Sequence, residues 1–297
     1  MPPLRINYDS PAGLKAFLDS RGLGMRKKFG QNFLINPNAR SRLLDALELE
    51  AGDTVWEVGP GLGAMTSGLL ERGAKVTAFE IDPAFCQVLR EEFGDKSEFL
   101  LAEGDVLKTW QLVRGGDCLL GNLPYNIAAV LLADFIEKKK FFKRMVVTVQ
   151  REVAQRIMAK PGSSDYSSFS VLCASAYKLS PLMVLKGASF YPPPKIDSQG
   201  VRFDLLDEAE RNSYPNLFQP LTRALFSSRR KTIRNNLINF INSVMLKGKV
   251  AGAAPGGETA QEALAGCGIS GDRRAETLEV AEFAALAQAL EKIIDHG

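Results

Sequence analysis

The sequence GNLPY places an amide, a rigid imide and an aromatic ring close together, at Asn122, Pro124 and Tyr125. They come directly after the apolar pair Leu119 and Leu120, where a buried strand should end and a plain loop should begin. A turn from a strand into a helix is the simple interpretation of such a stretch. These three side-chain types instead favour a binding site at the end of the strand.

Polar groups and glycines also follow neighbouring apolar runs. The loop EVGPGLGA contains Gly59 and Gly61, which let the backbone approach a ligand where a Cβ atom would collide. Glu57 lies two residues before the first of these glycines, and an acid there suits a cationic ligand better than a pyrophosphate. Glu80 and Asp105 end the next two runs. If the runs are parallel strands, all these groups meet in one crevice at the carboxyl edge of the sheet.

More than one ligand fits this pattern. Gly59, Gly61 and Ala64 satisfy the permissive dinucleotide motif G-x-G-x-x-G/A, with Glu80 at a suitable distance to bind ribose hydroxyls, so an NAD enzyme is a rival. Asp105 could accept a hydrogen bond from the amino group of an adenine. The acids could also merely cap the helices that follow them. The P-loop motif is absent from the sequence, which argues against a P-loop nucleotide hydrolase.

Histidine and cysteine chemistry is nearly excluded. The chain has one histidine, His296, so a serine or cysteine nucleophile driven by a histidine base is not expected. The four cysteines form no C-x-x-C pair and are expected to be buried free thiols: Cys86, Cys118, Cys173 and Cys267. We therefore expect neither a metal site nor disulfides.

The longest apolar run, IAAVLLA, is too short to cross a bilayer, and the first residues contain no signal-peptide core. We expect a cytoplasmic protein without a membrane partner.

Apolar runs alternate with helix-like stretches about twenty residues apart. The predicted strands cover 54–59, 75–82, 98–105, 118–125 and 144–150, with amphipathic helices between them that end at Gly73 and Gly94. This series predicts an α/β, Rossmann-like parallel sheet with helices on both faces. Residues 200–206 could add a strand, and residues 170–179 fit either a strand or a helix.

From about Asp207 the strand pattern stops and helical segments follow, at 217–245 and 279–294. Residues 248–260, rich in glycine and alanine, are predicted to form a flexible loop. We therefore predict a smaller, all-helical domain after the α/β domain.

The net charge of +3 is unevenly distributed. Residues 211–257 hold eight basic side chains and no acid, and smaller basic clusters occur at 21–31 and 137–144. Any one such run can be an ordinary solvated face. Three of them together favour a polyanionic partner such as nucleic acid.

These motifs, taken in order, resemble one known family. VWEVGPGLGAMTSGLL, VTAFEID, EGD and GNLPYN are similar to S-adenosylmethionine-dependent methyltransferases, specifically to the ribosomal RNA adenine N-6 dimethyltransferase family. The resemblance continues through residues 27–36, 188–203, 226–237 and 268–287, but not through the first ~24 residues or the loop near Gly252.

Within the family, RRKTIRNNL and RAETLEVAEF are most similar to the members that dimethylate two adjacent adenosines near the 3′ end of small-subunit ribosomal RNA. Members that modify a large-subunit adenine and confer macrolide resistance are one alternative. A non-catalytic nucleic-acid-binding protein of the same fold is another, although the intact GNLPY motif argues against it.

The resemblance implies a catalytic role for the stretch GNLPY. An adenine amine is a poor nucleophile. The Asn122 side-chain oxygen and the Leu123 main-chain oxygen would accept hydrogen bonds from its two N–H groups. Pro124 would aim these acceptors. Tyr125 and Phe190 would stack on opposite faces of the extruded base.

The resemblance also implies S-adenosyl-L-methionine as cofactor and no metal. Glu80 would bind the ribose hydroxyls, Asp105 the adenine amine, and Gly59 would lie against the methionine part. The full set of implied cofactor residues is Asn32, Leu34, Gly59, Gly61, Glu80, Asp105 and Asn122.

The predicted domains are an N-terminal extension at 1–24, a methyltransferase domain at 25–206 and a helical, rRNA-binding domain at 207–297. If SSRRKTIRNNLINF is helical, Arg230 and Arg234 lie four residues apart on one face and could meet successive phosphates. The predicted RNA-binding residues are Arg229, Arg230, Lys231 and Arg234. We expect the small ribosomal subunit as partner and a monomeric protein.

Overall fold

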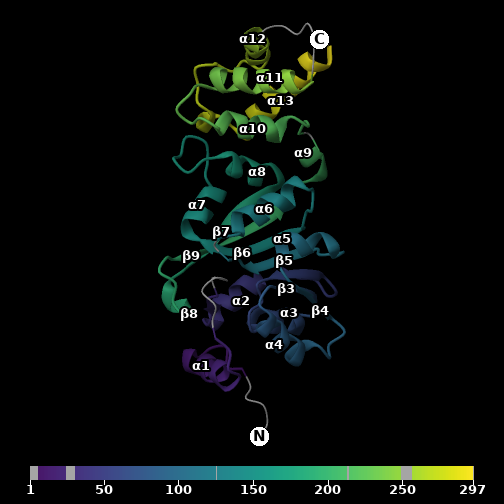
Figure 1. Ribbon diagram of the computed structural model, residues 1–297, viewed down its shortest axis with the longest axis vertical. Coiled ribbons are helices and arrows are strands. Elements are labelled where there is room, and N and C mark those ends of the chain that lie inside the picture. Colours follow the sequence, from purple (N-terminus) through teal and green to yellow (C-terminus); the bar gives the residue numbers. More distant parts are fainter. Residues whose placement is uncertain (1–5, 25–30, 125, 213, 249–255, 297) are drawn as a thin grey trace. The chain divides into compact units, whose positions relative to one another are not determined.

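A computed structural model describes residues 6–24, 31–124, 126–212, 214–248 and 256–296 (Figure 1). The chain divides into two compact units. Unit 1 comprises residues 1–154 and 179–205, and unit 2 comprises residues 155–178 and 206–297. The sequence prediction placed its boundary after residue 206, whereas the contacts group residues 155–178 with the helical unit.

The helices and strands alternate through the first half of the chain. The strands are β1 Phe33–Leu34, β2 Thr54–Val58, β3 Lys75–Glu80, β4 Phe99–Glu103, β5 Cys118–Asn122, β6 Arg144–Gln150, β7 Tyr177–Leu185, β8 Phe190–Tyr191 and β9 Ser198–Leu205. The first helices are α1 Pro11–Ser20, α2 Pro37–Asp45, α3 Ala64–Glu71, α4 Pro83–Phe93, α5 Val106–Thr109 and α6 Ala128–Glu137. The later helices are α7 Arg151–Ile157, α8 Ser168–Ala176, α9 Glu208–Asn212, α10 Phe218–Phe226, α11 Ile233–Gly248, α12 Gly256–Gly266 and α13 Val280–His296. The short 3₁₀ helices of the described residues are η2 Trp110–Leu112, η3 Gly187–Ser189 and η4 Ala275–Thr277.

Unit 1 is built on a seven-stranded sheet in the order β4-β3-β2-β5-β6-β9-β7. The first five strands of that order are parallel, and β9 runs antiparallel to β6. The order reverses between β2 and β5, so the carboxyl ends of these two strands flank the switch point where α/β sheets bind ligands. The predicted Rossmann-like domain is confirmed, with the addition of an antiparallel edge.

Two different cores hold helices on the faces of the sheet. On one face, Leu43 of α2 and Leu69 of α3 are buried in a cluster with Val55 and Val76 of the strands. On the other face, the ring of Trp56 lies 5.4 Å from Phe142 and 6.3 Å from Phe135 of α6. Because side chains alternate along a strand, Val55 and Trp56 can belong to opposite cores. Both cores hold the strand ends in place.

Unit 2 packs α10, α11, α12 and α13 around one apolar core (Figure 1). Phe218, Leu237, Leu264 and Phe283 each represent one of these helices in that core. Tyr166 also enters it, and its hydroxyl donates to the Leu278 carbonyl oxygen at 3.1 Å. This explains why residues preceding β7 belong to the helical unit.

The structure corrects parts of the sequence prediction. Residues 170–179 resolve into the end of α8 followed by the start of β7. The predicted loop at 248–260 is wrong for its last residues, since α12 begins at Gly256. Among the described residues, no helix is both long and apolar enough to cross a membrane.

The prediction of one continuous helix around SSRRKT is also wrong. Residues 227–231 form turns between α10 and α11. The Asn236 side chain donates to the carbonyl oxygens of Leu225 and Ser228, at 2.8 and 3.2 Å, and so satisfies the end of α10. Thr232 then accepts from the Asn235 amide at 3.4 Å, which is a capping contact for α11.

Candidate functional site

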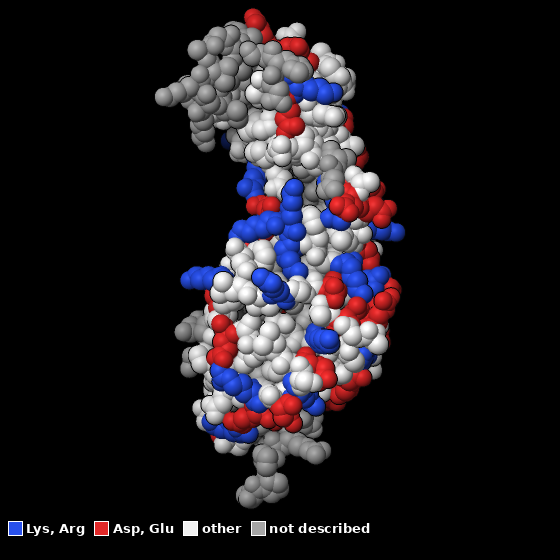
Figure 2. Space-filling model, turned by 90° about the vertical axis from the view of Figure 1, so that its right-hand side faces the viewer, with Lys and Arg blue, Asp and Glu red and all other residues white. Residues whose placement is uncertain are grey.

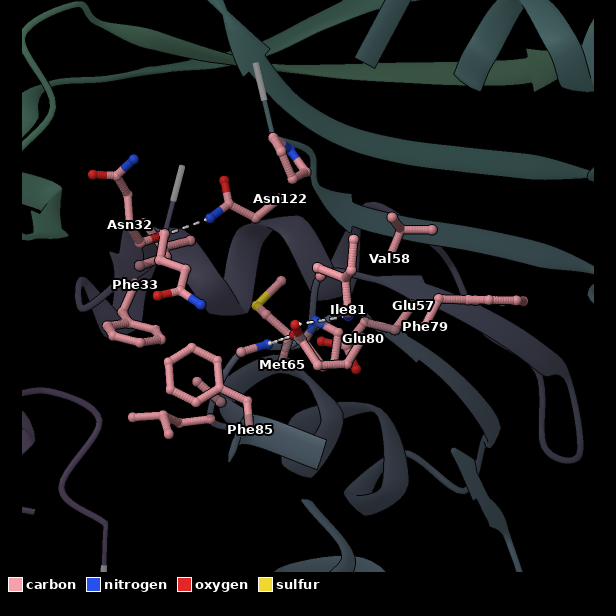
Figure 3. Close-up of a pocket in the computed structure, with 18 of the residues that line it drawn as sticks. Asn32, Phe33, Glu57, Val58, Met65, Phe79, Glu80, Ile81, Phe85 and Asn122 are labelled. Carbon is pink, nitrogen blue, oxygen red and sulfur yellow. Dashed lines mark hydrogen bonds between the residues drawn. The ribbon is translucent and has the colours of Figure 1, made fainter. Parts of the chain in front are cut away.

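A pocket of about 310 Å³ lies at the carboxyl edge of the parallel strands (Figure 3). Glu57 and Glu80 reach it from β2 and β3, Asp105 follows β4, and Asn122 ends β5. The predicted cofactor residues Asn32, Leu34, Gly59 and Gly61 line it as well. The structure thus brings all the predicted cofactor residues to one pocket.

The glycine loop lines the pocket, and its backbone adopts conformations in which a side chain would be strained. Gly59 and Gly61 have φ values of 73° and 59°. A Cβ atom on Gly61 would also lie 3.0 Å from the ring of Phe33. The loop therefore leaves room for β1 to close over it.

Glu80 is held by the backbone at the end of β3. One carboxylate oxygen accepts from the amides of Ile81 and Asp82 at 2.9 and 2.8 Å, and the other accepts from Gly61 at 3.2 Å (Figure 3). Burial raises the pKa of Glu80 to about 7, against the lowering effect of these bonds. A carboxylate offers about four acceptor sites, so the oxygen that faces Gly61 can also receive a ligand hydroxyl.

Glu57 is the most enclosed acid of the pocket, at 3% exposed. One of its oxygens accepts from the Thr66 hydroxyl of α3 at 2.6 Å. Burial raises the pKa of Glu57 to about 7, and the nearby charge of Glu80 raises it further, whereas the bond from Thr66 lowers it. Two enclosed carboxyl groups favour a cationic ligand, because a positive charge relieves the cost of ionising them.

Asp105 combines a structural contact with its place in the pocket. One of its oxygens accepts from the Leu107 amide at 3.1 Å and so caps α5. The capping interpretation is therefore correct for this acid, as it is for Asp82, which accepts from the Ala84 amide at 3.0 Å. Asp105 nevertheless lines the pocket. Helix capping and ligand contact are compatible, since a carboxylate has two oxygens.

Asn122 is oriented by the main chain on the far side of the pocket. Its side-chain amide nitrogen donates to the Asn32 carbonyl oxygen at 2.9 Å (Figure 3). Because that bond uses the nitrogen of the amide, it fixes the position of the Oδ1 atom. The side-chain oxygen is therefore left as an acceptor.

The residues after Asn122 turn the chain into α6. The Leu123 amide donates to the Thr148 carbonyl oxygen of β6 at 3.0 Å, and the Leu123 side chain is buried. Pro124 lines the pocket, and its carbonyl oxygen accepts from Ile127 and Ala128. Tyr125 lies outside the described residues.

Phe190, which is predicted to stack on the base, is buried in the core of unit 1. It is 3% exposed and packs with Leu34 in the core beneath the sheet, and it is not among the residues that line the pocket. Its strand β8 pairs with β1, with Leu34 opposite Phe190 and Phe33 opposite Tyr191. Stacking of Phe190 on a base thus stays a prediction.

The predicted RNA-binding side chains lie in unit 2 and are exposed: Arg229, Arg230, Lys231 and Arg234. Three of them lie in the turn before α11, and Arg234 lies in the first turn of that helix. Arg229 donates to the Ser164 carbonyl oxygen at 2.9 Å, which ties the turn to the segment between α7 and α8. Figure 2 shows one face on which Lys and Arg form several groups, some of them with few acids alongside.

Sequence reasoning missed several residues that line the pocket. Tyr8 and Leu14 come from the N-terminal segment, which shows no motif. Ile81 follows Glu80 and is 43% exposed, and Val106 follows Asp105. Ile81 and Val106 could have been predicted only from their positions directly after the strand-end acids, since the loop that follows each strand also borders the crevice.

Within the described ranges, no three His, Cys, Asp or Glu side chains are grouped so that they could hold a metal ion.

Comparisons with known proteins point to one family. The sequence profile described as ribosomal RNA adenine dimethylase matches residues 22–255. A ribosomal RNA small subunit methyltransferase A from Treponema denticola is 43% identical over 290 residues, which cover 96% of each chain. A protein of the same name from Treponema pallidum is 40% identical over 293 residues, which cover 97% of this chain and 99% of the relative.

Solved structures agree with the sequence comparisons. A dimethyladenosine transferase from Plasmodium falciparum superposes with a TM-score of 0.75 at 26% identity, over 87% of this chain and 97% of that one. The 23S rRNA methyltransferase ErmE gives a TM-score of 0.61 at 20% identity, over 87% and 99% of the two chains. The second likeness shows a shared fold.

Proposed function

The chain belongs to the ribosomal RNA adenine dimethylase family, and we propose that it acts on small-subunit ribosomal RNA. It transfers methyl groups from S-adenosyl-L-methionine to the exocyclic amines of two adjacent adenosines near the 3′ end of that RNA, in ribosome biogenesis. The observation that carries the proposal is the convergence of Glu80, Asp105 and Asn122 in one pocket. The two relatives from Treponema are small-subunit methyltransferases, which favours a small-subunit over a large-subunit substrate.

The pocket fits the methyl donor. Glu80 would receive the ribose hydroxyls on the oxygen that accepts from the Gly61 amide. Asp105 would accept from the adenine amine, and the side chains of Ile81 and Val106 offer apolar walls for the adenine ring. Glu57 places a second carboxyl group in the pocket, which suits the positive charges of the donor.

S-adenosyl-L-methionine supplies a methyl group bonded to a sulfonium sulfur, which leaves readily as a neutral thioether. The protein must therefore make the adenine amine a better nucleophile and hold it in line. The Oδ1 atom of Asn122 and the main-chain oxygen of Leu123 accept the two amine hydrogens, which draws the nitrogen lone pair out of the ring. The bond from Asn122 to the Asn32 carbonyl supports this role, because it aims Oδ1 at the substrate in advance.

The base must leave its RNA strand to reach this turn. Pro124 lines the pocket next to the acceptors, and Tyr125 and Phe190 remain proposed stacking rings. The exposed basic side chains of unit 2 would bind the phosphates of the RNA. We also propose that the protein acts as a monomer, in the cytoplasm where ribosomal subunits assemble.

The test uses purified small subunits that lack these methyl groups. The protein is incubated with them and with labelled S-adenosyl-L-methionine, and the RNA is then digested to nucleosides. We expect label in N6,N6-dimethyladenosine, at two adjacent positions near the 3′ end. Label that appears only with large subunits would replace the proposal by its alternative, and label with neither subunit would reject it.

A further inference from the structure

Residues 6–24 pack against the outer wall of the pocket. Helix α1 begins after Ser10, whose hydroxyl accepts from the Gly13 amide at 3.1 Å. The buried face of α1 consists of Leu14, Phe17 and Leu18. These side chains form one apolar cluster with Leu62 of the glycine loop and with Phe85 and Val88 of α4. In Figure 1, α1 lies beside α4 at the N-terminal end of the chain.

Tyr8 brings this segment into the pocket itself. Its side chain lines the cavity, and its hydroxyl donates to the Leu62 carbonyl oxygen at 3.0 Å. Burial raises the pKa of Tyr8, and the charges of Glu92 and Glu57 raise it further. The phenol therefore stays protonated at neutral pH and keeps donating to the glycine loop.

Arg40 of α2 links Tyr8 to strand β1 through hydrogen bonds. Its guanidinium donates to the Leu34 carbonyl oxygen at 2.8 Å and to the Tyr8 carbonyl oxygen at 3.4 Å. It also forms an ion pair with Asp9, and its side chain is only 11% exposed. The guanidinium uses two of its nitrogens, held in one plane, to reach three acceptors on two segments, whereas a lysine has all its N–H groups on a single nitrogen. The segment is thus held by polar contacts as well as by the apolar face of α1.

We propose that Tyr8 is a further residue of the methyl-donor site, and that Arg40 is the positioning residue that keeps it there. The docked segment 6–24 then closes one wall of the pocket and slows the release of the donor. The inference rests on the proposed function, because it takes the ligand of the pocket to be S-adenosyl-L-methionine. It extends the donor site to a segment that shows no motif in the sequence.

The experiment compares Arg40→Lys, Tyr8→Ala and Tyr8→Phe with the unmodified protein. Arg72→Lys is the matched control, since Arg72 also bonds a carbonyl oxygen, that of Gly68, and an acid, Asp45, but does not line the pocket. Calorimetry gives the Kd for S-adenosyl-L-methionine, and stopped-flow measurements give its dissociation rate. Methyl transfer to small subunits gives kcat and KM, and melting without ligand reports stability.

We expect Arg40→Lys and Tyr8→Ala each to raise the Kd about tenfold, through faster dissociation of the donor. Arg40→Lys loses hydrogen bonds made by a charged group, and Tyr8→Ala removes one wall of the pocket. The KM for the donor should rise with the Kd in both variants, while kcat at saturation in Tyr8→Ala stays within about twofold. Tyr8→Phe should have a smaller effect, because it removes only the bond to Leu62. Arg72→Lys should leave the Kd within about twofold.

Two results would overturn the inference. One is an unchanged Kd in both Arg40→Lys and Tyr8→Ala. The other is an equal rise in Arg72→Lys that follows the melting temperature, which would indicate a loss of general stability. Either result leaves the proposed function intact, as long as the unmodified protein binds the donor. If the unmodified protein does not bind it, the proposed function itself fails.

Discussion

Replacing Glu80 by glutamine tests the assignment of the donor's ribose to the end of β3. Glutamine has the same shape, but one of its two ends carries two N–H donors and no acceptor. Glu80 meets two backbone amides on one oxygen and the Gly61 amide on the other. The glutamine oxygen should take the position that accepts from the Ile81 and Asp82 amides, so the NH₂ group would face Gly61 and the ligand.

The size of the effect follows from these contacts. Hydrogen bonds to a charged group contribute about 1.5–3 kcal/mol, which corresponds to about 10- to 150-fold in Kd. Ribose hydroxyls can also accept from the new NH₂ group, so the loss in Glu80→Gln should lie near the lower limit, at about tenfold. Folding should be preserved, because the variant no longer buries an ionisable group whose pKa burial raises to about 7.

Calorimetry at pH 8, where Glu80 is mostly ionised, should be done with S-adenosyl-L-methionine and with its demethylated product. Both ligands have the same ribose, but only the donor has a sulfonium charge. A contact with the ribose therefore predicts the same fold loss for both. Glu103→Gln is a matched control, since Glu103 lies opposite Glu80 in the ladder but forms an exposed ion pair with Arg90. An unchanged Kd, or a loss confined to the donor, would refute the ribose assignment.

Three further predictions follow from the site and the basic turn. Asn122→Ala should lower kcat at least a hundredfold while the donor Kd changes no more than a few fold, because its amide acts on the acceptor amine; an equal collapse of binding would contradict this role. Burial raises the pKa values of Glu57 and Glu80 to about 7, and a cation favours their ionised forms, so the donor should bind at least about tenfold more weakly at pH 6 than at pH 8. In Glu57→Gln, the donor Kd measured by calorimetry should vary less with pH. An unchanged dependence of the Kd on pH would show that Glu57 does not contribute to it. Neutralising Arg230, Lys231 and Arg234 together should weaken small-subunit binding and reduce its salt dependence without changing the donor Kd; an intact salt slope would show that these are ordinary surface charges.

The architecture of unit 1 was predictable because it follows from periodic signals. Apolar runs about twenty residues apart predicted the five parallel strands, and the observed bounds differ by a few residues at most, as at β3 Lys75–Glu80. Helix interruption in unit 2 was not predictable in the same way. The break at 227–231 depends on the side chain of Asn236, which bonds the end of the preceding helix. Such a contact becomes visible only when the two helices are packed.

The same distinction applies to the site. Acids and glycines at strand ends converge by topology, so the sequence could place Glu57 and Glu80 in one crevice. Tyr8 and Arg40 could not be found in this way, because their contacts join segments far apart in the chain. The burial of Phe190 against Leu34 could not be predicted either, because it accompanies the pairing of β8 with β1.

Strand β1 links the two halves of the proposed reaction. On one side, Phe33 lies so close to Gly61 that a Cβ atom there would be 3.0 Å from its ring, and Leu34 is held by Arg40. On the other side, the carbonyl oxygen of Asn32, the residue directly before β1, accepts from the side-chain amide of Asn122. A shift of β1 would therefore disturb the donor wall and the orientation of Oδ1 at once. Because the alignment of Asn122 depends on a strand that also encloses the donor, a correctly aimed acceptor amide and a closed donor pocket should occur together.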